Sequence, residues 1–497
     1  MNARNRFQLL IVCACMAVSV MAQVERPKLV VGVMVDQMRW DYLYYYGDRY
    51  GEKGVKRLLD DGFSCENTMI PYVPTVTAIG HASVYTGTTP AQHGICGNNF
   101  FIENKDVYCC GDSTVKSVGS DTKRGKMSPH YMLASTIGDE LKIATDYRSK
   151  VIGIAIKDRA AILPAGHSAD AAYWWDKDAG CFVTSTFYMN ELPSWVTKFN
   201  KKHHGDIKGD PIMKPEGVTL TFDMAIAALD NERLGQRGET DMLAISISST
   251  DGIGHQYGTH TPETDAAYLQ FDKDLARFLN VLDAKVGKGQ YLLFLTADHG
   301  AAHNYNTLLK HRIPAGGWES WETAKQLRQY LKTLHPEADN LVTGENSYRF
   351  YLHHENIEKA GLSLQQVKEE AMEWLRKDNR IQFVIDFADA ANATVPPIIR
   401  DRLCYGYNPD RAGDIAVITK PQVFATTDKP DYRGTSHGAW NPYDAHIPCV
   451  FFGWKVPKGS TNKATYMTDI APTVCAMLHI QMPNACMGSA ITEISDN

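Results

Sequence analysis

The stretch Lys28-Leu-Val-Val-Gly-Val-Met-Val-Asp36 has no polar side chain between its two charged ends. Apolar and polar residues do not alternate along it, as they would in a strand with one solvent-facing side. Continuous apolarity over this length predicts a strand buried on both faces, as in a parallel sheet covered by helices. A carboxylate directly after such a strand is expected at the edge of the sheet where ligands bind.

Similar apolar runs recur at residues 150–156, 242–247, 291–296, 415–419 and 447–452. Helix-length segments lie among them at residues 132–144, 221–229, 265–281 and 468–478. This alternation predicts an α/β fold with a doubly wound, mostly parallel sheet and helices on both faces. Residues 158–239 and about 305–412 do not follow this alternation of strands and helices. We expect both to be cap insertions on a single domain of residues 23–497.

The composition is that of a folded protein, with 44% hydrophobic and 22% charged residues in a chain of 497. A disordered or collagen-like chain is excluded by these fractions. The formal net charge is −6. Without a basic surplus, a nucleic acid is not expected as a specific partner.

The first 22 residues read as a secretory signal peptide. Arg4 and Arg6 precede an apolar run over residues 9–21, and Val20-Met21-Ala22 offers small residues for cleavage near Ala22. The apolar run falls short of the ~20 residues that span a bilayer, so a membrane anchor is the weaker alternative. We expect an exported protein, with the periplasm as its location.

Nine cysteines remain after residue 22, and none has the C-x-x-C spacing of a redox or zinc motif. An odd number leaves at least one thiol free or paired between chains. Their pairing is not determined by the sequence.

Metal-type side chains follow several of the predicted strands. They are Asp36 after residues 28–35, Asp251 and His255 after residues 242–247, Asp298 and His299 after residues 291–296, and His437 in the late loop 434–438. Imidazole and carboxylate are ligands of zinc, and two such sets can hold the oxygens of an in-line phosphoryl transfer. Taken singly, each residue is explained better as a helix cap or a loop histidine. The set together predicts a two-metal site.

Three hydroxyls in residues 71–87 are candidate nucleophiles: Thr75, Thr77 and Ser83. This segment predicts a turn followed by a helix. A hydroxyl at a helix N-terminus lies beside free N–H groups that stabilise a phosphate. Capping of the helix is the alternative role, and the residues alone do not choose among the three.

Three further side chains could contact a phosphoryl group. Asn98, in His-Gly-Ile-Cys-Gly-Asn-Asn, can donate an amide N–H. Lys157 and Arg159 directly follow the run 150–156 and could together hold the charged oxygens of a monoester dianion. A solvated Lys-Asp-Arg trio that pairs internally is equally compatible with their spacing.

Taken in order, these motifs resemble the alkaline phosphatase superfamily, and within it the PafA-type, phosphate-insensitive monoesterases. The similarity runs from Val-Val-Gly-Val-Met-Val-Asp-Gln-Met at residues 30–38 to Met-Thr-Asp-Ile-Ala-Pro-Thr at residues 467–473. It implies an alkaline-phosphatase-like fold. The segment from about residue 200 to 239 looks shorter than in family members, which puts the cap over the site and the leaving-group preference in question.

The resemblance also implies a role for each site residue. Thr77 would be the nucleophile that becomes phosphorylated, and the chain would hold two zinc ions. One zinc would be bound by Asp251, His255 and His437, and the other by Asp36, Asp298, His299 and Thr77. Asn98, Lys157, Arg159 and the backbone N–H of Ala78 would hold the transferred phosphoryl group.

The implied activity is hydrolysis of a broad range of small phosphate monoesters at alkaline pH, with a monomer expected. In this family the Lys–Arg pair marks monoesterases, so Lys157 and Arg159 favour that activity. A phosphodiesterase or nucleotide pyrophosphatase on the same metal core is the main alternative. A sulfatase, a phosphoglycerate mutase and a binding protein without activity are weaker alternatives.

Overall fold

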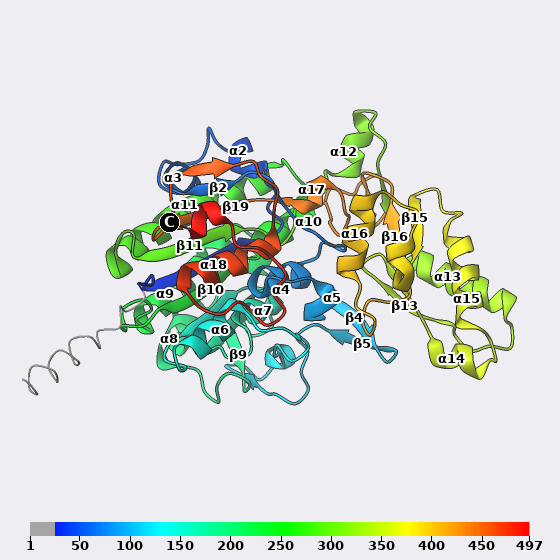
Figure 1. The fold of residues 1–497 in the computed structure, drawn as a ribbon, viewed down its shortest axis with the longest axis horizontal. Helices are drawn as coiled ribbons and strands as arrows, with labels where there is room; N and C mark the ends of the chain where they lie inside the picture. Colours follow the sequence, from blue (N-terminus) through cyan, green and yellow to red (C-terminus); the bar gives the residue numbers. More distant parts are fainter. Residues whose placement is uncertain (1–24, 497) are drawn as a thin grey trace, which may run out of the picture.

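The centre of the molecule is a ten-stranded sheet in the order β20-β2-β19-β11-β1-β10-β7-β8-β9-β6 (Figure 1). The computed structural model describes residues 25–496. The predicted signal peptide at residues 1–22 lies outside the described residues. In the part that is described, no helix is long and apolar enough to cross a membrane.

Five neighbouring strands at the middle of the sheet are parallel. They are β11 (Tyr291–Thr296), β1 (Leu29–Val35), β10 (Asp241–Ile247), β7 (Val151–Ala155) and β8 (Ala171–Asp176). Every residue of β1, β10 and β11 is buried. The prediction of a doubly wound, mostly parallel α/β sheet is therefore confirmed, and the apolar runs are continuous because both faces are covered.

One antiparallel strand flanks this parallel group on each side, and short strands lie beyond it. On one side β19 (Cys449–Gly453) pairs with β11, followed by β2 (Phe63–Cys65) and β20 (Gly459–Thr461). On the other side β9 (Cys181–Ser185) pairs with β8, followed by β6 (Ser117–Val118). The run 447–452 is thus a strand of the central sheet, but it runs against its neighbour.

Small residues allow the helices on one face to approach the sheet closely. Gly32, Ala244 and Gly153 lie opposite one another on adjacent strands. A Cβ at Gly153 would lie 2.1 Å from the carbonyl oxygen of Ala161 in α7 (Asp158–Ala165). A Cβ at Gly32 would lie 2.2 Å from the Tyr85 hydroxyl in α4 (Thr77–Thr86). The positions of α4 and α7, which carry candidate catalytic residues, therefore depend on these small side chains.

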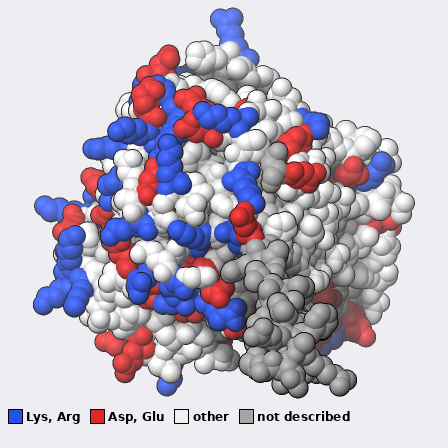
Figure 2. Space-filling view, turned by 60° about the vertical axis from the view of Figure 1, so that its left-hand side comes forward, with Lys and Arg blue, Asp and Glu red and all other residues white. Residues whose placement is uncertain are grey.

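The opposite face of the sheet is covered by α9 (Glu216–Asn231) and α11 (Pro262–Leu282). The remaining elements of this half are α2 (Tyr42–Tyr45), α3 (Val55–Asp61), α5 (Pro90–His93), α6 (Ile137–Ala144), α8 (Ser194–His203), α10 (Ser249–Tyr257), α17 (Pro442–Ala445), α18 (Ile470–Leu478), α19 (Thr492–Ser495), β3 (Thr68–Met69), β4 (Asn99–Ile102), β5 (Lys105–Tyr108), β18 (His446–Ile447) and β21 (Thr465–Tyr466). On the face shown in Figure 2, basic and acidic side chains are interspersed.

Residues 158–239, expected as a cap insertion, contribute much of the central core. They supply α7, β8, β9 and α9 to the sheet and to its two helical layers. The strand β8 reads Ala-Ala-Tyr-Trp-Trp-Asp, and its aromatic residues do not resemble the aliphatic runs of the other strands. The segment between α8 and α9 is irregular and contains the short 3-10 helix η2 (Pro211–Met213).

A smaller antiparallel sheet lies beside the central one, at the right of Figure 1. Its order is β13 (Val342–Asn346), β14 (Arg349–Leu352), β16 (Ile415–Thr419) and β15 (Ile381–Asp386). Helices α13 (Ser320–Leu334), α14 (His354–Lys359), α15 (Leu364–Leu375) and α16 (Pro397–Gly406), with α12 (Tyr305–Lys310) and the strand pair β12 (Gly316–Trp318) and β17 (Val423–Ala425), complete this half. The run 415–419 was expected in the parallel sheet, and the structure places it here because its partners are β14 and β15.

One apolar layer joins the two sheets, and we call it the joining layer. The small sheet contributes Ala416 and Ile418, α7 contributes Ala161, and Phe100 of β4 lies among them. Alternate residues of β16, such as Val417, face the separate core under α13 and α15. The segments that carry Thr77 and Asn98 run along the edge of the joining layer, so the small sheet supports the candidate site.

The close approach of α7 to β7 predicts that Gly153→Ala is destabilising. The added methyl group has no room against the Ala161 carbonyl, and overpacking of this kind costs about 1–3 kcal/mol of unfolding free energy. Gly316→Ala is the matched control, because a Cβ there meets nothing within 4 Å. Urea unfolding of both variants measures the difference; equal midpoints would contradict the packing described.

Candidate metal centre and active site

Three buried carboxylates converge at the carboxyl ends of the central strands. Asp36 follows β1, Asp298 follows β11, and Asp251 lies in the first turn of α10 after β10. All three are 3% exposed or less. The Lys157 ammonium, at the start of α7, lies 2.6 Å from Asp36 Oδ2 and 2.6 Å from Asp251 Oδ2. It is therefore a positive charge shared between two of the carboxylates.

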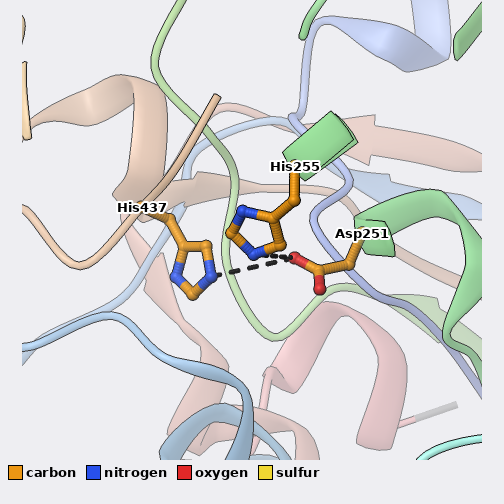
Figure 3. A group of neighbouring side chains, drawn as sticks. All are labelled: Asp251, His255 and His437. Atoms are coloured by element: carbon orange, nitrogen blue, oxygen red, sulfur yellow. Dashed lines mark ion pairs between the residues drawn. The ribbon is translucent and has the colours of Figure 1, made fainter. Parts of the chain in front are cut away.

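The first group of possible metal ligands is Asp251, His255 and His437 (Figure 3). The i, i+4 spacing on α10 places Asp251 and His255 on one face of the helix. His255 Nε2 lies 3.1 Å from Asp251 Oδ1, and His437 Nε2 lies 3.7 Å from the same oxygen. His437 arrives from the loop after β17, so the fold joins residues from two distant segments.

The second group surrounds the Nε2 atom of His299. Asp298 Oδ2 lies 3.4 Å from it, Thr77 Oγ1 3.5 Å and Asp36 Oδ1 3.6 Å. Bonds of about 2.0–2.2 Å to a tetrahedral zinc ion imply ligand–ligand distances of roughly 3.3–3.6 Å. Distances in both groups are close to this value. Asp251, Asp36 and His299 also lie within reach of one ion, so Asp251 of the first group lies close to the second group as well.

Two carboxylate oxygens in the second group fit a cation. Asp36 Oδ1 and Asp298 Oδ2 are buried without a hydrogen-bond partner among residues 25–496. A buried charge that lacks a partner is strongly unfavourable, and a coordinated cation satisfies it. The donor set, the spacing and these two oxygens together fit a pair of divalent ions.

Backbone carbonyls fix the orientation of all three histidine rings. Each ring donates its Nδ1 hydrogen and so leaves Nε2 as the acceptor. The carbonyl acceptors are Thr435 for His255 (2.9 Å), Thr75 for His437 (2.7 Å) and Gly300 for His299 (3.0 Å). Such contacts select the tautomer that binds a metal.

Burial sets the protonation of the site. It lowers the pKa of His299 to about 4 and that of His437 well below its usual range, so both rings are neutral at pH 7. Burial and the neighbouring Asp36 raise the pKa of Asp298 well above its usual value. Burial opposes ionisation of Asp251, but His255 and Lys157 outweigh it and lower that pKa. Neutral imidazole is the form that coordinates a metal.

The three candidate hydroxyls lie in different surroundings. Thr75 Oγ1 donates to the carbonyl of Ala439 (3.0 Å), and Ser83 Oγ lies 3.0 Å from His93 Nε2. Only Thr77 faces the second group of ligands. It is the first residue of α4, where backbone N–H groups are free of helical partners.

Asn98 lies beside the nucleophile candidate. Its Oδ1 accepts a hydrogen bond from the Ala78 backbone N–H at 3.0 Å, which leaves the amide Nδ2 hydrogens to donate. The Ala78 N–H, expected to hold a phosphoryl oxygen, is thus engaged by Asn98 in this structure. Gly80 permits this approach of α4, because a Cβ there would lie 2.4 Å from the Asp298 carbonyl oxygen.

Lys157 and Arg159 both line a pocket of about 470 Å³ next to the carboxylates. Arg159 Nη1 donates to the Tyr108 hydroxyl at 3.1 Å, and that hydroxyl donates to Asp158. Arg159 Nε is buried without a hydrogen-bond partner in the described part of the chain. The Lys-Asp-Arg trio is therefore not a solvated surface group, although Asp158 and Arg159 do pair: Arg159 Nη1 lies 3.9 Å from Asp158 Oδ1, and the Arg159 backbone N–H donates to the same oxygen at 2.6 Å.

The sequence reasoning missed Gln37, which contacts two of the carboxylates. Its backbone N–H donates to Asp298 Oδ1 (3.1 Å) and its Nε2 to Asp251 Oδ1 (2.6 Å). A φ of 67° allows both contacts, and Gly254 leaves room, because a Cβ there would lie 1.9 Å from Gln37 Oε1. Its position directly after Asp36 was the one available signal.

Asp444 was also missed, and it links the two loops that carry histidine ligands. Its Oδ2 accepts from the Ala439 N–H (2.7 Å), and its carbonyl accepts from the Gly300 N–H (2.7 Å). Gly300 follows His299, and Ala439 lies two residues after His437. No local motif marks Asp444. Gly300 is distant in the sequence, and the contact with Ala439 depends on the conformation of the loop between them.

Comparisons with known proteins agree with this geometry. The family of type I phosphodiesterases and nucleotide pyrophosphatases matches residues 30–440. The chain is 44% identical to a protein named calcium-transporting ATPase from Myroides odoratus, over 97% of each chain. It is 41% identical to alkaline phosphatase PhoV of Synechococcus elongatus (95% of this chain, 93% of the relative) and 40% identical to alkaline phosphatase PafA of Elizabethkingia meningoseptica (95% of each).

Solved structures give the same result. The crystal structure of wild-type PafA matches with a TM-score of 0.91 and 40% identity, covering 95% of this chain and 99% of that one. Mouse ectonucleotide pyrophosphatase/phosphodiesterase 5 shares the fold at a TM-score of 0.61 and 17% identity, over 94% of this chain and 99% of that one. The chain belongs to the type I phosphodiesterase / nucleotide pyrophosphatase family, within the alkaline phosphatase superfamily. The resemblance to its PafA-type members is confirmed.

The burial of Asp444 predicts a specific pH dependence of stability. Burial raises the pKa of this carboxyl to about 8, above its value of near 4 in an unfolded chain. The folded state then binds the extra proton, so this contribution to stability is complete below pH 4 and is lost as the pH rises to about 8. Asp444→Asn removes it. Relative to the variant, the wild type should lose stability between pH 5 and pH 8 in denaturant titrations; parallel profiles would contradict the assignment.

Proposed function

We propose that this chain is a metal-dependent alkaline phosphatase that hydrolyses a broad range of small phosphate monoesters through a phospho-threonine at Thr77. The observation that carries the choice of monoesters is the pairing of buried Lys157 with half-buried Arg159 beside the metal ligands, where Arg159 Nε is buried and lacks a hydrogen-bond partner among the described residues. A monoester dianion has a charged oxygen where a diester has an ester group. A guanidinium with a buried, unpartnered N–H donor favours the charged oxygen of the monoester.

Relatives support the proposal at the level of residue types. PhoV and PafA are named alkaline phosphatases. A PafA variant of known structure carries substitutions at one Thr, one Asn, one Lys and one Arg, and the spacings Thr-to-Asn and Lys-to-Arg equal those of Thr77, Asn98, Lys157 and Arg159.

Two zinc ions per chain are the proposed cofactors. Asp251, His255 and His437 would hold one, and Asp36, Asp298, His299 and Thr77 would hold the other. When bound, the ions supply Lewis acidity and lower the pKa of a coordinated hydroxyl or water.

The residues of the chain then perform two displacements. Thr77 Oγ attacks phosphorus in line, the bond to the leaving oxygen breaks, and the alcohol departs. Water next attacks the phospho-threonine, which releases inorganic phosphate and restores the hydroxyl. Asn98 Nδ2, Lys157 and Arg159 hold the nonbridging oxygens, where charge is largest in the transition state.

Residues 4–22 support a proposed export of the enzyme to the periplasm, where it would act as a monomer. Phosphodiester hydrolysis remains the second candidate, because the matching family is described by that activity. A further relative is named an ATPase, so ATP belongs among the substrates to be tested.

Paired rate assays test the choice of substrate. An aryl phosphate should exceed the matching aryl methyl phosphate in kcat/KM by orders of magnitude, and Thr77→Ala should abolish both activities. Lys157→Ala/Arg159→Ala should lower the monoester rate by roughly 10³-fold or more and the diester rate by about tenfold or less. Lys177→Ala is the control, because Lys177 lines the same pocket but is half exposed. Faster diester cleavage by the wild type would establish a phosphodiesterase instead.

Metal analysis tests the two ligand groups separately. Elemental mass spectrometry of the purified enzyme should find two zinc ions per chain. We expect His437→Ala and Asp298→Ala each to lower the content toward one. His354→Ala is the control, since His354 pairs with Asp414 in the small sheet and should leave the content at two. An unchanged metal content in both ligand variants would refute the two proposed ligand groups.

The hydrolysis rate of the wild type should rise toward alkaline pH.

A further inference from the structure

A second buried cation lies in the joining layer, away from the metal ligands. Arg349 is the first residue of β14 and is 2% exposed. It lies opposite Ala416 of β16, which faces the joining layer, so the Arg349 side chain points the same way. Its Nε donates to the carbonyl of Asn346 at 3.3 Å.

Arg349 has no ion-pair partner among residues 25–496, and its Nη1 and Nη2 lack a hydrogen-bond partner there. The neighbouring Glu345 carboxyl lies beyond ion-pair distance; burial raises its pKa although Arg349 acts in the opposite direction. The neighbouring Cys96 thiol is a weak acceptor. Burial raises the pKa of Cys96 to about 11 although Arg349 acts in the opposite direction, so the thiol is neutral. A buried guanidinium in this state needs an anionic partner.

A small cavity lies at the same place. It measures about 20 Å³, which is room for one water-sized species. Arg349, Trp440, Phe387, Leu403, Val73 and Pro74 contribute to its lining. Trp440 Nε1 is buried and likewise has no partner in the described chain. Every side-chain polar atom of the lining that lacks a partner is therefore a donor.

We propose that this cavity binds one small inorganic anion of the size of chloride, with Arg349 and Trp440 as its donors. An anion accepts hydrogen bonds from all three N–H groups and neutralises the guanidinium. A water molecule would bring two hydrogens of its own, and the lining offers them no unpaired side-chain acceptor. Phosphate, with five heavy atoms, is too large for the cavity.

The anion would connect three segments of the candidate active site to the small sheet. Val73 and Pro74 lead into the segment of Thr77, and Trp440 follows His437 by three residues. A Cβ at Gly97, the neighbour of Asn98, would lie 3.0 Å from Arg349 Nη2. The proposed role is therefore structural support of these segments, and it does not depend on which phosphate ester is the substrate.

Bromide provides a direct test of binding in the wild-type enzyme. Crystals soaked in bromide and measured at its absorption edge should show an anomalous peak between Arg349 and Trp440. Crystals of Trp440→Phe, which keeps the ring and loses one donor, should show a weaker peak. Density without anomalous signal at saturating bromide would mean a water molecule and would overturn the proposal.

Thermal unfolding tests the consequence in solution. At constant ionic strength, chloride should raise the wild-type Tm by about 3 °C over gluconate, which is too large for the cavity. The difference should shrink in Trp440→Phe and vanish in Arg349→Met. Arg411→Met is the matched control, because Arg411 donates to the carbonyls of Gly94 and Tyr131 and needs no anion. It should lower Tm equally in both salts. Equal wild-type Tm values in chloride and gluconate would refute the proposal even if Arg349→Met fails to fold.

Discussion

The mutual repulsion of Asp36, Asp251 and Asp298 is the constraint on which the site depends. Because β1, β10 and β11 are parallel neighbours, their carboxyl ends bring three buried carboxylates together at one edge of the sheet. At such short distances and with little solvent, like charges are stable only when cations or protons compensate them. Lys157 supplies one charge, and two carboxylate oxygens remain without a hydrogen-bond partner from residues 25–496. A site of this kind is suited to bind cations, which compensate the remaining negative charge.

The surrounding structure holds the compensating groups in place. Gly153 lets α7 lie close to the sheet, and the start of α7 carries Lys157 to the carboxylates. Backbone carbonyls orient the imidazoles, and Asp444 ties the loops that present them. The second sheet acts through the joining layer, where another buried cation, Arg349, lies behind the same loops. The positions of the ligands thus reflect packing far from the metal centre.

The local sequence was sufficient to predict features that depend on a single strand. The apolar run before Asp36 indicated a strand buried on both faces, and the parallel arrangement then placed the following carboxylates together. Local sequence could not choose among Thr75, Thr77 and Ser83, because the partners that distinguish them are distant: Thr75 bonds a residue 364 positions away. For the same reason residues 415–419 were recognised as a strand but assigned to the wrong sheet. The sheet to which a strand belongs depends on its pairing with strands distant in the sequence. The hydrophobic periodicity of the strand itself does not indicate that pairing.

The fold does not decide between monoesters and diesters, since a phosphodiesterase of 17% identity shares it. The difference must come from the groups that meet the nonbridging oxygens. Tyr108 and Asp158 hold Arg159 beside Lys157 and leave its Nε buried and without a partner in the described chain. Such a donor is unfavourable until an anionic oxygen reaches it. Under the proposed function, a monoester brings one more charged oxygen than a diester, so binding it would relieve this cost, whereas a diester would leave the Nε donor without an acceptor. Selectivity of this kind arises from a penalty against the wrong substrate as much as from attraction to the right one.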